Sequence, residues 1–268
     1  SKCMLQPAEH FWPVFDHLIE TVSKLEKILQ NDGDSKPEPE DFALELIPHF
    51  DDQENHFREI VGDSQTRLTL CKIACLLHDI AKPTTRTIDN NNRIRFLGHD
   101  KKGSEMAEII LKRLRFSRAA TSIVATQVRQ HLRPSQMAPN GKLPSKKAMY
   151  RYYRDLGEES IDNLFLNMAD YMAARGPLLK KDEWKTHCEI INHIISSGLA
   201  EKKPQKQERL VTGHDIMGGL RLSPGRHIGI LIEEVTESFV EGKVTTKEEA
   251  MELVRKLVES GDYFEKEC

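Results

Sequence analysis

Apolar residues recur every three to four positions through most of the chain, which is the spacing of amphipathic helices. Between Trp12 and Gln30 the recurring residues are Val14, Leu18, Val22, Leu25 and Leu29. The same pattern predicts further helices over residues 67–80, 104–114, 119–131, 160–174 and 184–197. We therefore predict an all-α protein.

Residues that break helices divide this pattern. Pro83 is expected to end the helix over 67–80 at Lys82-Pro83. Two short β-branched and apolar runs flank Asp89 and three asparagines, and they predict one short β-hairpin. Residues 133–147, with three prolines and Asn140-Gly141, are expected to form a loop.

The polar, lysine-rich stretch 198–209 is typical of a linker. It predicts a first domain over residues 1–200 and a smaller helical C-terminal unit over 201–268. In that unit Thr246 is expected to cap the last helix, with Glu249 three residues later.

Composition narrows the function classes. The 268 residues carry a formal net charge of -3, which argues against a protein that coats nucleic acid by charge alone. The longest apolar run, 68–81, is interrupted by Lys72, His78 and Asp79, so we expect no membrane span. Five cysteines form no disulfide framework; Cys71 and Cys75 are expected as buried apolar side chains, and reduced thiols fit a cytoplasmic protein.

The stretch CKIACLLHDIAKP carries the main chemical signal. An apolar helix ends by presenting His78 and Asp79 side by side, with Lys82 one turn further on. Burying Asp79 in such a segment needs a compensating partner, and a divalent cation bound by imidazole and carboxylate is one. The dipeptide alone is weak, because His99-Asp100 and His214-Asp215 repeat it; the latter lies in a glycine-rich turn typical of a helix cap.

Four other residues are candidate ligands, and each also has a purely structural interpretation. His17 shares a stripe with apolar residues, where a histidine is more often part of the core. His131 ends a helix, where it could interact with the helix dipole. Asp170 lies in an apolar helix and needs a partner. His99 follows Gly98, a glycine that would allow a close backbone approach.

The order His17, His78-Asp79, Asp170 resembles the H…HD…D signature of the HD superfamily of metal-dependent phosphohydrolases. The segments PAEHFWPVFDHLIETV, LLHDIAKP, RFLGHDKKGSEMAEIILKRLRFS, VRQHLRP and LFLNMADYMAARG resemble successive blocks of the HD domain in bacterial tRNA nucleotidyltransferases. The stretch from about Val211 to Ala250 resembles the region that follows that domain. The nucleotidyltransferase head has no counterpart here, so we expect no nucleotide addition by these residues alone. A free-standing HD protein and a fragment of a longer enzyme both stay open.

The resemblance implies an HD-domain helical bundle and a function. His17, His78, Asp79 and Asp170 would hold a first metal, and His99 and His131 a second, with Asp79 as a possible bridge. One or two divalent ions are expected, drawn from Mn, Fe, Ni, Co, Zn or Mg. The implied reaction is hydrolysis of a phosphomonoester or phosphodiester of a nucleotide or RNA end, for example a 2′,3′-cyclic phosphate.

Three basic residues could contact the substrate phosphate. Lys82 would act as a point charge beside Asp79 in catalysis. Arg133 and Arg175 each follow a candidate ligand by a few residues and could bind phosphate through two hydrogen bonds. An ordinary solvated arginine is the alternative for both.

Two other functions compete with hydrolysis. The chain could be a tRNA-holding module, with basic stretches at 142–154 and 202–209 against an RNA backbone; solvated surface is the plainer interpretation of both stretches. It could also be a nucleotide sensor that binds metal and ligand without turnover. The sequence indicates neither the substrate nor the oligomeric state.

Overall fold

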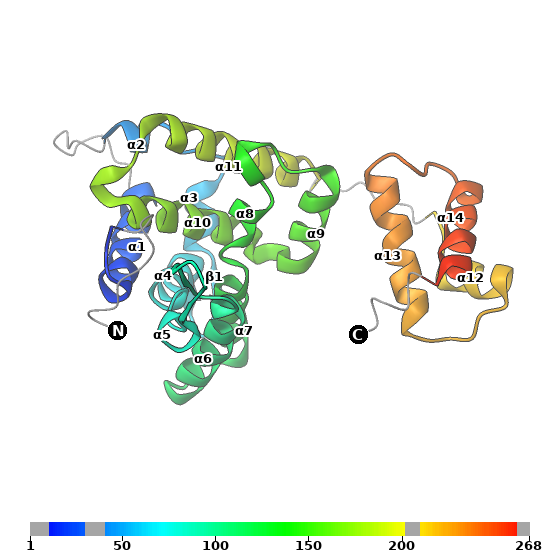
Figure 1. Ribbon diagram of the computed structural model, residues 1–268, viewed down its shortest axis with the longest axis horizontal. Helices are drawn as coiled ribbons and strands as arrows, with labels where there is room; N and C mark the ends of the chain where they lie inside the picture. The colour runs from blue at the N-terminus through cyan, green and yellow to red at the C-terminus, as the bar shows by residue number, and fades with distance from the viewer. Residues whose placement is uncertain (1–10, 30–40, 202–209, 262–268) are drawn as a thin grey trace. The chain divides into compact units, whose positions relative to one another are not determined.

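The computed structural model describes residues 11–29, 41–201 and 210–261. Contacts between residues group the chain into two compact units, 1–144 with 152–199 and 145–151 with 200–268 (Figure 1). Among the described residues the chain consists of helices and two small two-stranded sheets, which confirms the all-α fold class. Most of the predicted linker lies outside the described residues. The division into domains 1–200 and 201–268 stays a proposal.

The first unit is a bundle of long helices. These are α1 (Val14–Leu29), α4 (Arg67–Leu77), α6 (His99–Arg113), α7 (Arg118–Gln130), α10 (Ser160–Arg175) and α11 (Lys181–Glu201). Each follows one of the predicted periodic segments, because apolar side chains at helical spacing are buried along it. Among the described residues, no helix has both the length and the apolar character that a membrane crossing requires.

Helix α10 lies at the centre of this unit. Thirteen of its sixteen residues are buried, so it is enclosed on all sides rather than along one stripe. It packs against α1, α4 and α7. Next to it, the fully buried Trp184 of α11 donates a hydrogen bond from Nε1 to the backbone oxygen of Ala43 at 2.8 Å. Asp170 is therefore carried on the most enclosed helix of the unit.

The chain turns sharply after α4. The helix ends at Leu77, three residues before the predicted end, and His78 caps it. The short helix α5 (Lys82–Thr85) then begins where the prediction placed a stop. Pro83 sits in its first turn, where a missing N–H costs no hydrogen bond, so this proline starts a helix instead of ending one. The turn leaves His78 and Asp79 between two helices.

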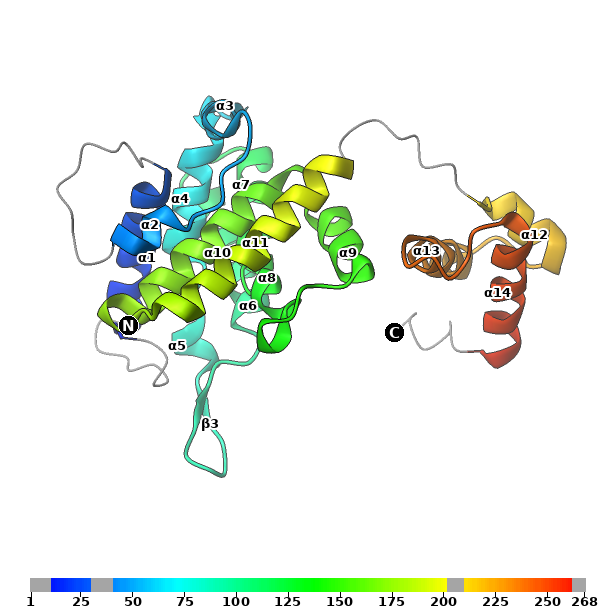
Figure 2. The ribbon, with the colours of Figure 1, turned by 90° about the horizontal axis from the view of Figure 1, so that it is seen from above.

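Strands β3 (Thr87–Ile88) and β4 (Ile94–Arg95) form the predicted hairpin, which projects from the bundle in Figure 2. A second pair, β1 (Ile60–Gly62) and β2 (Gln65–Thr66), was not predicted. Its two turn residues, Asp63 and Ser64, have φ values of 50° and 62°. Positive φ at both central residues is the geometry of a type I′ turn, which Asn-Gly or Asp-Gly signals more clearly than Asp-Ser does.

Several helices were not predicted from the sequence; most are short, but one of them, α9, has eleven residues. They are α2 (Asp41–Glu45), α3 (Gln53–Arg58), α8 (Arg133–Gln136), η1 (Pro139–Gly141), α9 (Lys146–Leu156), η2 (Gly157–Glu159) and η3 (Gly176–Leu178). The predicted loop over 133–147 is thus wrong in part, since α8 and η1 occupy much of it. Helices of one turn bury too few residues to leave a pattern.

The second unit contains α12 (Gly213–Leu220), α13 (Arg226–Val240) and α14 (Lys247–Ser260) around a small apolar core. Thr246 and Glu249 form the predicted capping box at the start of α14. A second capping box joins Thr212 to Asp215 at the start of α12. The His214-Asp215 dipeptide therefore belongs to a helix cap, as expected.

Asp162, near the start of α10, is a buried carboxylate that the sequence analysis did not single out. It is 0% exposed, lies 2.7 Å from Nε2 of His56 and accepts a hydrogen bond from the guanidinium of Arg67 at 3.4 Å. Asp162→Asn removes the charge that faces these two groups. We expect it to lower the free energy of unfolding by about 3 kcal/mol, because a buried cation is left with weaker partners.

Denaturation in urea measures this change, with the exposed Asp182→Asn as a control expected within about 0.5 kcal/mol of the parent chain. An equal effect of the two variants would show that Asp162 contributes no more than a surface carboxylate does.

Candidate metal centre

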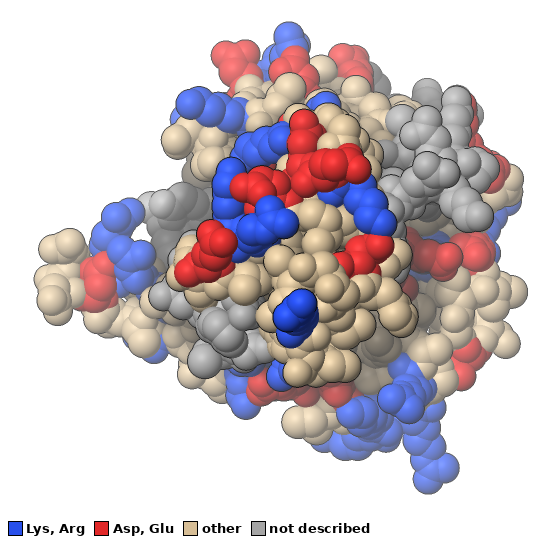
Figure 3. All heavy atoms as spheres, turned by 90° about the vertical axis from the view of Figure 1, so that its right-hand side faces the viewer, with Lys and Arg blue, Asp and Glu red and all other residues tan. Residues whose placement is uncertain are grey.

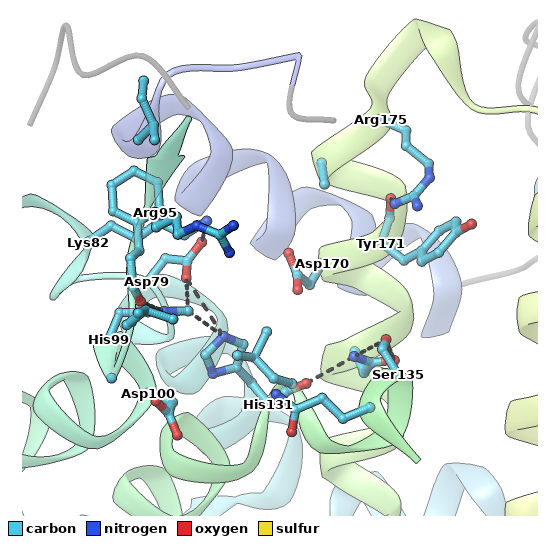
Figure 4. Close-up of a pocket in the computed structure, with 18 residues that line it drawn as sticks. Asp79, Lys82, Arg95, His99, Asp100, His131, Ser135, Asp170, Tyr171 and Arg175 are labelled. Atoms are coloured by element: carbon cyan, nitrogen blue, oxygen red, sulfur yellow. Dashed lines mark hydrogen bonds and ion pairs between the residues drawn. The ribbon is translucent and has the colours of Figure 1, made fainter. Parts of the chain in front are cut away.

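Six candidate ligands come from five helices or their ends and meet in the first unit. His17 lies on α1, His99 begins α6 and Asp170 lies on α10. His78-Asp79 follows α4, and His131 caps α7. Figure 4 shows Asp170 projecting from α10 toward Asp79, His99 and His131, which lie across the cavity.

These residues surround a cavity of about 560 Å³. Asp79, His99, His131 and Asp170 line it, whereas His17 and His78 are fully buried and do not. Gly98 precedes α6 with a φ of 75°, a left-handed conformation that glycine adopts without strain. A Cβ atom here would meet no atom within 4 Å. The glycine therefore serves the turn into His99 and not the close backbone approach that we expected.

The first group of ligand atoms comprises two imidazoles and two carboxylates. Nε2 of His17 lies 3.2 Å from Nε2 of His78, 3.4 Å from Oδ2 of Asp79 and 3.0 Å from Oδ1 of Asp170. Nε2 of His78 lies 3.4 Å from each of the same two carboxylate oxygens. Atoms that share one metal at about 2.0–2.2 Å are separated by roughly 3.0–3.6 Å. These five distances, from the two imidazole nitrogens to each other and to the two carboxylates, therefore fall in the range of a coordination shell.

The second group uses the other oxygen of Asp79. Oδ1 lies 3.2 Å from Nε2 of His99 and 3.7 Å from Nε2 of His131, and the two nitrogens are 3.3 Å apart. This oxygen is buried and accepts no hydrogen bond within the described part of the chain. A buried carboxylate oxygen without a donor is costly, and a cation would satisfy it. Asp79 is thus placed to bridge two ions.

Backbone carbonyls fix the orientation of three of these histidines. Nδ1 of His78, His99 and His131 each lies 2.6–2.8 Å from the carbonyl oxygen three residues earlier. An Nδ1–H that donates to this carbonyl leaves the Nε2 lone pair directed at the centre. Metal-bound histidines are commonly oriented in this way. Of the two neutral tautomers of each imidazole, the fold therefore favours the one that a metal requires.

Burial and charge oppose one another in this centre. Burial disfavours the ionised carboxylates, yet Lys82 and His78 hold the pKa of Asp79 well below its ordinary value. His78, with His17, does the same for the pKa of Asp170. Burial also disfavours a charged His78, but Asp79 and Asp170 raise its pKa well above the usual range. In the absence of a metal a proton on His78 thus partly neutralises the two carboxylates.

His131 differs from His78 in its electrostatics. Burial, and then the charge of His78, lower the pKa of His131 to about 4. The imidazole is therefore neutral near pH 7, which is the form that binds a cation. The donor set of imidazole nitrogens and carboxylate oxygens fits a divalent transition metal.

The three candidate phosphate-binding residues differ in their position relative to the cavity. Nζ of the buried Lys82 lies 2.5 Å from Oδ2 of Asp79 and lines the cavity. Arg175 also lines it, and its guanidinium lies 3.3 Å from the ring centre of Tyr171. Arg133 does not line it, because its guanidinium pairs with Asp155 at 2.7 Å. The structure therefore brings Lys82 and Arg175 to the cavity and leaves Arg133 outside.

Several polar or aromatic residues of the cavity were missed by the sequence analysis, among them Arg95, Ser135, Asn167 and Tyr171. Asn167 donates a hydrogen bond to the backbone oxygen of His131 at 2.9 Å and so supports the end of α7. Its place one helical turn before Asp170 was a usable signal. Arg95 and Ser135 reach the cavity from a hairpin and a short helix, and no periodicity marked them.

His187 on α11 was also missed by the sequence analysis. Its burial predicts a pH dependence of the free energy of unfolding. Burial lowers the pKa of His187 to about 3, against about 6.5 in an unfolded chain. Below about pH 6.5 the His187 side chain of the unfolded chain is protonated, whereas that of the folded chain stays neutral down to about pH 3. The free energy of unfolding therefore decreases as the pH falls through this range. Between about pH 6 and 4 we expect the parent chain to lose about 1.4 kcal/mol per pH unit more than His187→Phe.

Urea denaturation of both proteins across this range measures the difference. Any constant offset from the larger phenylalanine leaves the slope unaffected. Parallel pH profiles would mean that His187 takes up its proton in the folded chain as readily as in the unfolded one.

Sequence comparison with known proteins finds a matching family and several relatives. The sequence matches the family described as HD domain over residues 14–175. It is 33% identical to the CC-adding tRNA nucleotidyltransferase of Thermus thermophilus over 181 residues, which are 67% of this chain and 38% of that protein. It is 30% identical to the A-adding tRNA nucleotidyltransferase of Deinococcus radiodurans over 192 residues, 71% of this chain and 42% of that protein. The chain thus spans about two fifths of the length of these relatives.

Proposed function

The chain belongs to the HD domain family, and on that premise we propose that it is a metal-dependent phosphohydrolase. Its substrate would be a phosphomonoester or phosphodiester of a nucleotide or RNA end, such as a 2′,3′-cyclic phosphate. The observation that supports this most is the position of Asp79, whose two carboxylate oxygens face two separate pairs of imidazole nitrogens. Two metal ions side by side are a recurrent arrangement for phosphoester displacement.

The proposed ligands divide between two ions. His17, His78, Asp79 and Asp170 would hold the first, and Asp79, His99 and His131 the second. Mixed nitrogen and oxygen donors suit Mn, Fe, Ni, Co or Zn better than Mg alone. When bound, such ions polarise phosphoryl oxygens and lower the pKa of a water nucleophile.

The chain's own residues would orient the substrate and balance its charge. Lys82 keeps Asp79 ionised and presents its positive charge to the cavity, where a phosphate oxygen would lie. Arg175, held against the Tyr171 ring, can donate two parallel hydrogen bonds to a phosphate. Arg95 lines the same cavity from the hairpin, although it also pairs with Asp89 at 2.8 Å. Three cations therefore border the place where we put the phosphate.

A tRNA-holding role is the second candidate, and the names of the relatives favour it. The basic surface expected over 142–154 gives it little support. Lys147 and Arg151 form ion pairs with Glu237, and the hydroxyls of Tyr152 and Tyr153 donate to backbone oxygens. Acidic and basic side chains are also interspersed on the face drawn in Figure 3. The stretch 202–209 lies outside the described residues.

Metal removal and restoration test the proposal. The chain is stripped with a chelator and then assayed on 2′,3′-cyclic AMP and on bis(p-nitrophenyl) phosphate, before and after addition of Mn²⁺ or Ni²⁺. We expect the stripped chain to be inactive and the reconstituted chain to hydrolyse at least one substrate. Metal uptake without turnover of any phosphoester would favour the sensor role, and no uptake at all would favour the RNA-holding role.

A further inference from the structure

A second cavity, of about 330 Å³, adjoins the metal cavity. It lies between α8, η1, α10 and α11, and its walls include Ala138, Asn140, Thr186 and Ile190. Ser135 and Tyr171 line both cavities, so a ligand that extends from the metal centre past these two residues would enter it (both are labelled in Figure 4). The volume is at the lower end of the range of about 300–1,000 Å³ for small-molecule sites.

His187 is a buried polar residue in the wall of this cavity. Its side chain lines the cavity, the residue is only 6% exposed, and Nε2 has no hydrogen-bond partner in the described part of the chain. Nε2 itself is not accessible from the cavity, so a ligand there would meet another part of the imidazole ring. The metal centre makes no use of this nitrogen.

The imidazole is held in one orientation by stacking. Its ring lies 4.1 Å from the Tyr171 ring with an angle of 15° between the planes. Arg175 covers the same tyrosine, with its guanidinium 3.3 Å from the ring centre. The stack of Arg175, Tyr171 and His187 therefore connects the phosphate side of the metal cavity to the second cavity.

The lining indicates the class of ligand. Ala138 and Ile190 supply apolar walls, whereas Ser135, Asn140 and Thr186 supply neutral polar groups. Glu183 lines the cavity too, and its carboxylate disfavours a second phosphate there. A flat ring with apolar faces and a hydrogen-bonding edge fits this set, and a nucleobase is such a ring.

We propose that the cavity lined by His187 binds the base of the nucleotide or RNA end whose phosphate lies at the metal centre, with the accessible part of the His187 imidazole against the edge of the base. This rests on the proposed function for the phosphate, but the base site itself needs neither metal nor turnover. It assigns substrate selection to α10, α11 and the loop around Asn140 and leaves the reaction to the metal ligands.

Adenosine, which has no phosphate, tests the base site separately. In the ¹⁵N-histidine-labelled chain, the ring-nitrogen resonances of His187, assigned with His187→Phe, should shift on titration with adenosine. Ribose 5-phosphate should not shift them. The phenylalanine variant keeps a flat ring against Tyr171 but lacks the nitrogen, so it should bind adenosine about tenfold more weakly. Resonances unmoved by adenosine would overturn the proposal.

Kinetics supply a second readout. His187→Phe, and Thr186→Phe as a variant that fills the cavity from an exposed position, should each raise KM for 2′,3′-cyclic AMP about tenfold with kcat little changed. Their kcat/KM for methyl ribofuranoside 2′,3′-cyclic phosphate, which has no aromatic ring, should equal that of the parent chain. Equal losses on both substrates would contradict a base site. Adenosine binding without any hydrolysis would retain the base site and refute the proposed function.

Discussion

Asp79→Ala should remove both metal ions and lower the rate of phosphoester hydrolysis by at least about 100-fold. The reason is that Oδ2 of Asp79 lies within 3.4 Å of Nε2 of His17 and His78, while Oδ1 lies 3.2 Å from Nε2 of His99. One substitution therefore takes a ligand from each group. Lys82 also loses its ion-pair partner at 2.5 Å, so its charge no longer balances a carboxylate.

Elemental analysis and hydrolysis of 2′,3′-cyclic AMP measure the two effects. Asp215→Asn is the matched control. Asp215 also follows a histidine in a His-Asp pair, but it belongs to the capping box of α12 in the second unit. It should retain the full metal content and rate, at a cost of about 1 kcal/mol to the helix. Asp79→Asn repeats the test without a change of side-chain volume. Full metal content in both Asp79 variants would refute the bridging role.

His131→Ala should cause the loss of one of the two proposed metal ions, while the other stays bound. His131 contacts only the second group, with Nε2 at 3.3 Å from Nε2 of His99 and 3.7 Å from Oδ1 of Asp79. The four atoms of the first group stay in place. We expect the metal content to fall by half, and the rate to fall about 10- to 100-fold because one ion is missing from the displacement.

His187→Ala is the control for His131→Ala, since it also removes a buried histidine of the first unit but no proposed ligand. Its metal content should be unchanged. If His131→Ala lost both ions, the two groups would not be separate sites; if it lost neither, His131 would not be a ligand.

The sequence predicted most of the bundle because its long helices bury continuous apolar stripes. Helices α1, α7 and α10 follow the periodic segments to within a few residues. The ends were harder to place. Pro83 can end one helix or begin another, and only the packing around His78 and Asp79 decided that it begins α5.

The ligand set came from residue types and from a resemblance, and the distances came only from the fold. Arg133 and Arg175 illustrate the limit. Both follow a candidate ligand closely, but Arg133 pairs with Asp155, which lies 22 residues away, while Arg175 stacks on Tyr171 and lines the cavity. No local pattern distinguishes these outcomes. His187 could not be singled out from the sequence for a similar reason. Its proposed role depends on the stacking of its ring on Tyr171, which joins α10 to α11.

The claim that Asp79 bridges two ions is tested most directly by electron paramagnetic resonance of the chain loaded with two equivalents of Mn²⁺. Two ions joined by one carboxylate are exchange-coupled, so we predict a coupled spectrum that reverts to the six-line signal of isolated Mn²⁺ in His131→Ala. A six-line spectrum from the fully loaded parent chain would contradict the bridged centre.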